Sequence, residues 1–181
     1  MKYSDIKQSL PHQQVIAETY GEILPASIRR LMNIVQPTTH DVFVDLGSGM
    51  GKVVQQVFKE TPVKEARGIE VIPELHQVAQ QNVTEMSREA PEYFMNGREL
   101  VLILGDFLQT NLASATITLM GSPCFGPTML DELASIIEKT PTIHTVLSLR
   151  PLLHLSRLSF KRALRVECSW DSAQCYLYKN T

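Results

Sequence analysis

The sequence predicts an α/β fold: a mostly parallel sheet with helices on both faces and an antiparallel strand pair at the C-terminal end. Short β-branched runs alternate with longer segments of helical periodicity, which is the pattern of βα units. The run 41–46, DVFVDL, passes directly into a glycine-rich turn that opens a helix. Two late apolar runs, 164–169 and 174–178, lie close enough in sequence to pair as antiparallel neighbours.

The first 40 residues are predicted to be helical. Residues 5–19 have scattered apolar side chains and predict a first helix, which the tripeptide at 20–22 interrupts. A second helix begins at Pro25, a favoured first-turn residue, because apolar residues recur after it at helical spacing. Pro37 ends this helix, since proline cannot donate a backbone hydrogen bond.

Residues 41–181 then alternate strands and helices. Because parallel strands bring their carboxyl ends to one edge of a sheet, we expect a ligand site at that edge. The predicted helices begin at 52, 73 and 129, and the predicted strands are 41–46, 66–71, 100–104, 115–120, 145–149, 164–169 and 174–178.

Composition limits the classes of protein. The chain has 181 residues, 44% of them hydrophobic and 20% charged, as expected of one compact domain. Its net charge of −2 disfavours a nucleic-acid binder that is basic throughout. Three cysteines without a CxxC pair, and histidines without ligand spacing, predict no metal site. With no apolar N-terminal stretch and no long apolar run, we expect no membrane contact, and a cytoplasmic location or delivery without a standard signal peptide.

Three glycines follow the first predicted strand. Gly47, Gly49 and Gly51 form GxGxG, with Asp45 before them and Lys52 opening the next helix. Glycines permit positive φ and close approach of a ligand, and the helix N-terminus offers free N–H groups. A dinucleotide fingerprint needs GxGxxG, so an NAD-dependent dehydrogenase is disfavoured. The spacing is instead typical of S-adenosylmethionine (SAM) sites.

Two further clusters end the next strands. Glu70 closes the second strand, where its carboxylate can accept hydrogen bonds from a ribose diol. Asp106 and Phe107 follow the third strand, where a carboxylate can accept from an adenine amine and a ring can stack on the base. Together with the glycine turn, these clusters favour SAM as the cofactor.

The ordered phrases YGE (20–22), DLGSGMG (45–51), GIE (68–70), GDF (105–107) and CFGP (124–127) resemble the Dot-type, non-SET histone-lysine methyltransferases. The resemblance covers residues 20–178. The family has bacterial relatives, and this chain resembles a short member of that kind. This resemblance implies a Rossmann-like class I methyltransferase fold with a seven-stranded sheet, in which 1–40 carries a cofactor-covering loop and 41–181 forms the SAM-binding core. The implied cofactor-binding residues are Tyr20, Glu22, Asp45, Gly47, Ser48, Gly49, Gly51, Lys52, Glu70, Asp106 and Phe107.

The resemblance implies a methyl transfer from SAM to a protein lysine, with S-adenosylhomocysteine as the product. This reaction is an in-line displacement, so the protein positions the reactants and excludes water, and an apolar channel would favour a neutral lysine. The loop after the fourth strand departs from the eukaryotic pattern, which has two asparagines there and a glutamine at Lys52. The substrate-side candidates are Gly121, Ser122, Phe125 and Tyr176, with Trp170 as a further candidate for the channel wall.

A basic stretch without acids lies between 150 and 166. It predicts a docking patch for an acidic partner, such as an acidic or nucleic-acid-associated protein substrate, or simply a solvated helix or loop face. Its members are Arg150, Arg157, Lys161, Arg162 and Arg165. Two other functions remain open. One is a nucleic acid base N-methyltransferase, because Ser122–Phe125 partly resembles the Asn/Asp-Pro-Pro-aromatic motif of those enzymes. The other is a SAM-binding protein without turnover.

Overall fold

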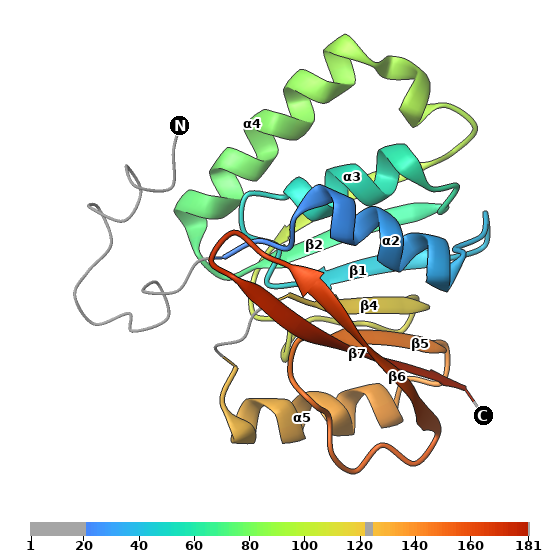
Figure 1. Cartoon of the computed structure of the whole chain (residues 1–181). Helices are drawn as coiled ribbons and strands as arrows, with labels where there is room; N and C mark the ends of the chain where they lie inside the picture. The colour runs from blue at the N-terminus through green and yellow to red at the C-terminus, as the bar shows by residue number, and fades with distance from the viewer. Residues whose placement is uncertain (1–20, 122–124, 181) are drawn as a thin grey trace.

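The computed structural model describes residues 21–121 and 125–180. It contains a seven-stranded sheet in the order β3-β2-β1-β4-β5-β7-β6 (Figure 1). Strands β1 to β5 are parallel, while β7 runs antiparallel to both β5 and β6. The predicted fold class is therefore confirmed. The strands are β1 Val42–Leu46, β2 Glu65–Glu70, β3 Glu99–Leu104, β4 Ile117–Met120, β5 Thr145–Ser148, β6 Leu158–Glu167 and β7 Ser172–Asn180.

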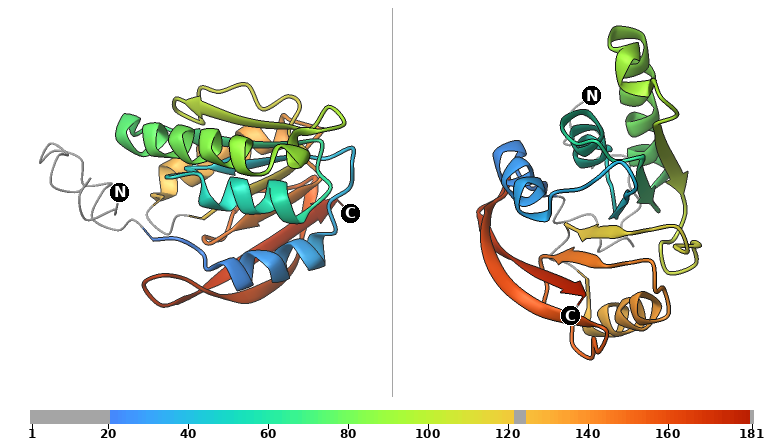
Figure 2. Two further views of the ribbon diagram at one scale, coloured as in Figure 1. Left: turned by 90° about the horizontal axis from the view of Figure 1, so that it is seen from above. Right: turned by 90° about the vertical axis from the view of Figure 1, so that its right-hand side faces the viewer.

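Helices cover both faces of the sheet (Figure 2). Alternate residues of β1 explain why: Phe43 packs in one core cluster with helices α2 and α3, whereas Val44 packs in another with helix α5. The predicted helix 5–19 lies outside the described residues. The helices are α2 Pro25–Val35, α3 Lys52–Glu60, α4 Pro73–Glu89 and α5 Pro127–Glu138, with a short 3₁₀ helix at Pro91–Phe94.

Three of the four α-helices within 21–121 and 125–180 begin at a proline. Pro25, Pro73 and Pro127 each open a helix, since proline at the first turn loses no intrahelical bond. Helix α2 ends at Val35, and the capping residue Gln36 adopts a left-handed conformation with φ of 54° before Pro37. The predicted helix starts at Pro25, Lys52 and Pro73 are confirmed, whereas α5 begins at Pro127 rather than at 129.

Strand β6 differs most from expectation. It begins at Leu158 rather than at 164, and its pairing with β7 is interrupted between Phe160 and Arg162. The bulge breaks the alternation of apolar and polar residues, which is why the sequence pattern hid the first half of the strand. The interpretation of 150–166 as a helix or loop face is therefore wrong for the part from Leu158 onward.

A hydrogen-bond network joins three strands at the amino edge of the sheet, opposite the glycine turn. Asp41, just before β1, accepts from Thr116 Oγ1 at 2.8 Å and lies 2.9 Å from Nε2 of His144. Its other carboxylate oxygen accepts from the Thr38 backbone at 2.7 Å. Asp41 therefore anchors the starts of β1, β4 and β5 and leaves the carboxyl edge for the site.

Candidate functional site

The glycine turn between β1 and α3 has the backbone that only glycine adopts readily. Gly47, Gly49 and Gly51 have φ angles of 84°, 53° and 75°. The Gly47 and Ser48 N–H groups donate to the Ile69 carbonyl at 2.9 and 3.0 Å, which fixes the turn against β2. The turn thus presents backbone, without side chains at three positions, at the carboxyl edge of the sheet.

Two neighbours come unusually close to this turn. A Cβ at Gly51 would lie 3.0 Å from Cβ of Ala79 in α4. The Ser48 hydroxyl lies 2.7 Å from the position of a Cβ at Gly68, so the Ser48 side chain packs on β2. Ser48 therefore belongs to the turn as predicted, and its side chain packs against the sheet.

Glu70 stabilises the turn from the end of β2. Its Oε2 accepts from the Gly49 N–H at 2.7 Å, and its Oε1 accepts from the Ile72 N–H at 2.8 Å. Burial raises the pKa of Glu70 in spite of these bonds, which act in the opposite direction. The backbone N–H of Val71 also bonds the carboxylate, so three of its four lone-pair sites are occupied and one remains for a hydrogen bond from a ligand.

Three carboxylates converge at the turn. Burial, then the negative charges of Glu70 and Glu22, raise the pKa of Asp45 well above its usual range. An ionised Asp45 is therefore costly in the free protein. A ligand with positive charge would lower this cost, so the electrostatics of the turn favour a cationic ligand.

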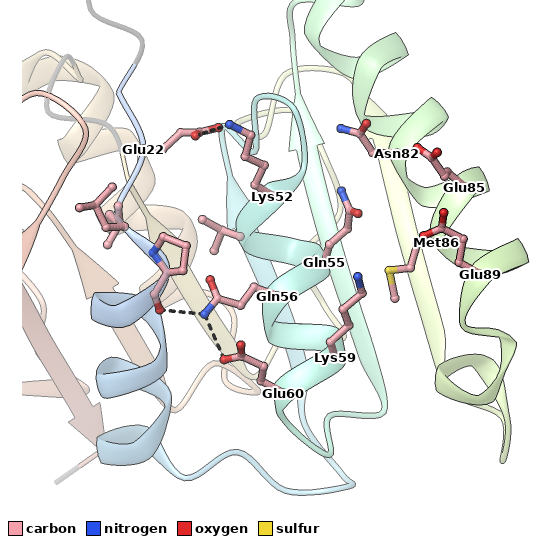
Figure 3. A pocket seen from close by; sticks show the side chains of 14 residues that line it. Glu22, Lys52, Gln55, Gln56, Lys59, Glu60, Asn82, Glu85, Met86 and Glu89 are labelled. Atoms are coloured by element: carbon pink, nitrogen blue, oxygen red, sulfur yellow. Dashed lines mark hydrogen bonds and ion pairs between the residues drawn. The ribbon is translucent and has the colours of Figure 1, made fainter. Parts of the chain in front are cut away.

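Glu22 and Lys52 form an ion pair beside the turn, with 2.7 Å between Oε2 and Nζ (Figure 3). The Lys52 side chain is 56% exposed and the Glu22 side chain 22%. The pair stands at one end of a groove of about 610 Å³ that is lined by α2, α3 and α4. Opposite charges at this place complement a zwitterion such as an amino acid head group.

Two aromatic rings flank the turn on its other side. Phe107 is buried, and its ring centroid lies 5.2 Å from that of Phe125 at a tilt of 52°. Cζ of Phe125 approaches Gly47 to 3.4 Å from the position of a Cβ. Asp106 is exposed, and its Oδ1 accepts from the Leu108 N–H at 2.9 Å, which shapes the loop after β3. The structure thus brings the three predicted clusters together.

The substrate-side candidates lie at the same edge. Gly121 follows β4, and a Cβ there would meet Cδ1 of Ile23 at 3.8 Å, an ordinary contact. Tyr176 stands opposite Ser148, the last residue of β5, and its ring centroid lies 6.3 Å from that of Phe160. Tyr20, Ser122 and Cys124 lie outside the described residues.

The hydrogen bonds of Arg157 exclude its side chain from the predicted docking patch. Its guanidinium donates to the carbonyls of Ile137, Thr140 and Ile143 at 2.8, 3.0 and 2.6 Å. These bonds satisfy carbonyls at and after the end of α5, so this side chain is occupied within the fold. Lys161, Arg162 and Arg165 remain exposed on β6, and Arg165 pairs with Glu167 at 3.4 Å.

Sequence reasoning missed the partner of the segment that carries Glu22. Backbone bonds join residues 22–24 to the turn between β6 and β7. Gly21 also lies against Trp170, at a separation that leaves no room for a Cβ. A contact between a glycine and an aromatic residue far away in the sequence leaves no local pattern, so sequence reasoning could not find it.

Within 21–121 and 125–180, no group of three or more histidine, cysteine or acidic side chains is placed to hold a metal ion. In the same residues, no helix combines the length and hydropathy needed to cross a membrane.

The sequence of this chain is similar to a described protein family and to several named proteins. A family described as "Histone methylation protein DOT1" matches residues 6–170. A histone-lysine N-methyltransferase specific for H3 lysine-79 from Drosophila melanogaster is 31% identical over 120 residues, 64% of this chain and 6% of that protein. One from Mycosarcoma maydis is 28% identical over 78% of this chain and 18% of its own length. A protein-lysine N-methyltransferase of Saccharolobus islandicus is 27% identical over 51% of this chain and 53% of its own length.

Solved structures show the same fold at low sequence identity. An RNA methyltransferase of Salinibacter ruber, in complex with S-adenosyl-L-homocysteine, matches with a TM-score of 0.58 at 17% identity and covers 94% of each chain. A putative RNA methyltransferase of Pyrococcus horikoshii matches with a TM-score of 0.61 at 17% identity, over 87% of this chain and 81% of that one. These likenesses show a Rossmann-like methyltransferase fold.

Proposed function

This chain belongs to the DOT1 histone methylation family, and on that premise we propose that it transfers a methyl group from SAM to a lysine amine of a protein. The observation that carries the proposal is the glycine turn with its carboxylates. The turn offers glycine backbone that a ligand can approach closely, a ribose acceptor at Glu70 and a negative field that suits a sulfonium and an ammonium. The chain spans only 6% and 18% of the length of these two histone methyltransferase relatives, so the lysine acceptor is part of the proposal.

The described residues fit this cofactor part by part. Glu70 would hold the ribose, because its carboxylate is fixed at the turn and keeps a lone pair for a hydroxyl donor. Asp106 and Phe107 would hold the adenine, with Phe125 closing the other side of Gly47. Glu22 and Lys52 would bind the ammonium and the carboxylate of the amino acid end. Gly47, Gly49 and Gly51 allow the backbone to approach.

When bound, the cofactor supplies an activated methyl group on a positive sulfur. The protein needs no nucleophile of its own, and its residues orient the acceptor and exclude water. We place the acceptor amine between Gly121 and Tyr176, where the ends of β4 and β5 meet. Aromatic walls at Phe125 and Tyr176 would favour the neutral amine, which is the reactive form.

The partner is proposed to be an acidic protein or a protein associated with nucleic acid. The exposed Lys161, Arg162 and Arg165 on β6 support this, because they form a positive edge at the end of the sheet. Arg157 is left out of this surface, since its guanidinium is bonded to backbone carbonyls. A cytoplasmic location remains a prediction.

A label-transfer assay tests the proposal. The protein is mixed with SAM carrying a radioactive methyl group and with histones, nucleosomes, cell lysate or total RNA. We expect label that protease removes and nuclease does not. Nuclease-sensitive label would favour base methylation instead, and SAM binding without any transfer would favour a binding protein without turnover.

Two variants sharpen this assay. Glu70→Ala should abolish SAM binding and transfer, because it removes the ribose acceptor and the bond to Gly49. Glu74→Gln removes an acid of the same charge from the exposed surface of α4 and should leave both unchanged. Equal activity of the Glu70→Ala variant and the unmodified protein would contradict the assigned cofactor site.

A further inference from the structure

The segment that carries Glu22 is paired with the turn between β6 and β7. The Ser169 N–H donates to the Glu22 carbonyl at 2.8 Å, and the Glu22 N–H donates to Ser169 Oγ at 3.1 Å. Ile23 and Cys168 form an antiparallel bridge, and the Leu24 N–H donates to the Glu167 carbonyl at 2.8 Å. Residues 147 positions apart in the sequence therefore fix the backbone of Glu22.

Trp170, in the same turn, packs against Gly21. A Cβ on Gly21 would overlap the six-membered ring of Trp170 at Cε3 and Cζ3, and it would lie 2.8 Å from Cδ2. The close approach of the ring is the physical reason for glycine at 21.

The same segment reaches the glycine turn through a side chain. Glu22 follows Gly21 directly, and its carboxylate binds Nζ of Lys52 at 2.7 Å. Lys52 is the first residue of α3, immediately after Gly51. A short chain of contacts thus runs from the Trp170 ring, through Gly21 and Glu22, to the start of α3.

We propose that Trp170 is a positioning residue, whose ring on Gly21 holds Glu22 beside the glycine turn in the place that binds the amino group of the cofactor. This inference rests on the proposed function, namely SAM binding at the turn. It differs from the expectation that Trp170 walls a lysine channel. A ring that positions Glu22 controls cofactor affinity, whereas a ring in the channel wall controls turnover of the acceptor.

Variants on both sides of the contact separate these roles. Trp170→Ala removes the ring, and Gly21→Ala pushes it away with one added methyl group. Both should weaken S-adenosylhomocysteine binding and raise the KM for SAM roughly tenfold, while kcat changes little. Trp170→Phe should restore most of the affinity, because a phenyl ring can still cover Gly21. Met95→Ala, at a residue that is 60% exposed and outside the contact, serves as the control.

A measurement without cofactor uses the single tryptophan of the chain as a probe. Acrylamide should quench Trp170 fluorescence more strongly in Gly21→Ala than in the unmodified protein, because the ring loses its cover. Equal quenching in both proteins would overturn the contact itself. Thermal unfolding of each variant shows whether it is folded, and Trp170→Phe keeps the test decisive if Trp170→Ala does not fold.

The outcomes separate the two proposals. An unmodified protein that binds no SAM contradicts the proposed function. A protein that binds SAM, with Trp170→Ala and Gly21→Ala both retaining its affinity, contradicts the positioning role alone. A fall in kcat at unchanged affinity would place the Trp170 ring against the acceptor and would also overturn the positioning role.

Discussion

Asp45 is a buried carboxyl group whose ionised form is unfavourable in the protein without a ligand. Because burial and two neighbouring acids raise its pKa, ionisation costs more in the folded chain than in the unfolded chain. Stability therefore falls as pH rises from the ordinary aspartate pKa through the raised value. We expect Asp45→Asn to increase the free energy of unfolding at pH 7 by about 1 kcal/mol and to weaken SAM binding. Urea unfolding and calorimetric titration would measure the two effects, and a destabilised variant would contradict the electrostatic account.

Asp41 shows the opposite shift. Burial raises its pKa, but hydrogen bonds from Thr38, Thr116 and His144 outweigh burial and lower it overall. A lowered carboxyl pKa contributes stability that is present above the unfolded value and is lost as pH falls through the folded value. We expect Asp41→Asn to be destabilised at pH 7 and to lose less stability than the unmodified protein between about pH 5 and pH 3. Denaturant midpoints across this range give the answer, and parallel pH curves would refute it.

Gly51 has both a positive φ and a close neighbour, whereas Gly97 has only a positive φ. Both have a positive φ, 75° and 70°, but a Cβ at Gly51 would lie 3.0 Å from Ala79, whereas nothing lies within 4 Å at Gly97. Gly97→Ala should cost about 1 kcal/mol from backbone strain alone. Gly51→Ala should cost more, about 2–3 kcal/mol, because the α3–α4 contact must also open. Equal losses in thermal unfolding would show that the contact is unimportant.

At the scale of elements, arginine side chains secure the ends of helices. Arg98 donates to the carbonyls of Phe58 and Thr61, at and beyond the end of α3, and Arg157 does the same after α5. Each arginine comes from a segment distant in sequence and bonds to carbonyls at a helix end that have no partner within the helix.

Arg157→Gln is therefore expected to lower the free energy of unfolding by about 2 kcal/mol, since several carbonyls lose their donor. Arg162→Gln, on the exposed part of β6, should change it by less than about 0.5 kcal/mol. Chemical denaturation of the pair measures the difference. Equal stability of the two variants would contradict this structural role, and Arg157 would again be counted among the residues of the docking patch.

The contrast between elements shows what a sequence pattern can predict. Strand β1 and the glycine turn were predictable because a β-branched run and GxGxG are local signatures. Strand β6 was only half predictable, because its bulge interrupts the alternation on which strand prediction depends. The clustering of Glu70, Asp106 and Phe107 followed from the rule that parallel strands share a carboxyl edge. The contact between Gly21 and Trp170 has no periodicity, so only the tertiary structure reveals it.

At the scale of the whole molecule, α2 is continuous with the core of the sheet. Ile28 and Leu31 are fully buried in the same cluster as Phe43 and Leu147. We expect the segment 21–40 and the sheet to unfold in one cooperative transition. Far-UV circular dichroism and Trp170 fluorescence should give coincident melting curves, and an earlier loss of fluorescence would show that the N-terminal segment detaches first.

The open sheet also has consequences for how copies of the chain meet. One of its two edge strands, β6, carries exposed Lys161 and Arg162 at the bulge, and the Leu24 N–H bonds its far end at Glu167. Irregular, positively charged edges resist pairing with a second edge strand, because like charges oppose each other and the hydrogen-bonding groups fall out of register. The bulge and the charges of β6 therefore oppose pairing between two copies, and a variant with a regular, uncharged β6 is expected to aggregate at a lower concentration than the unmodified protein.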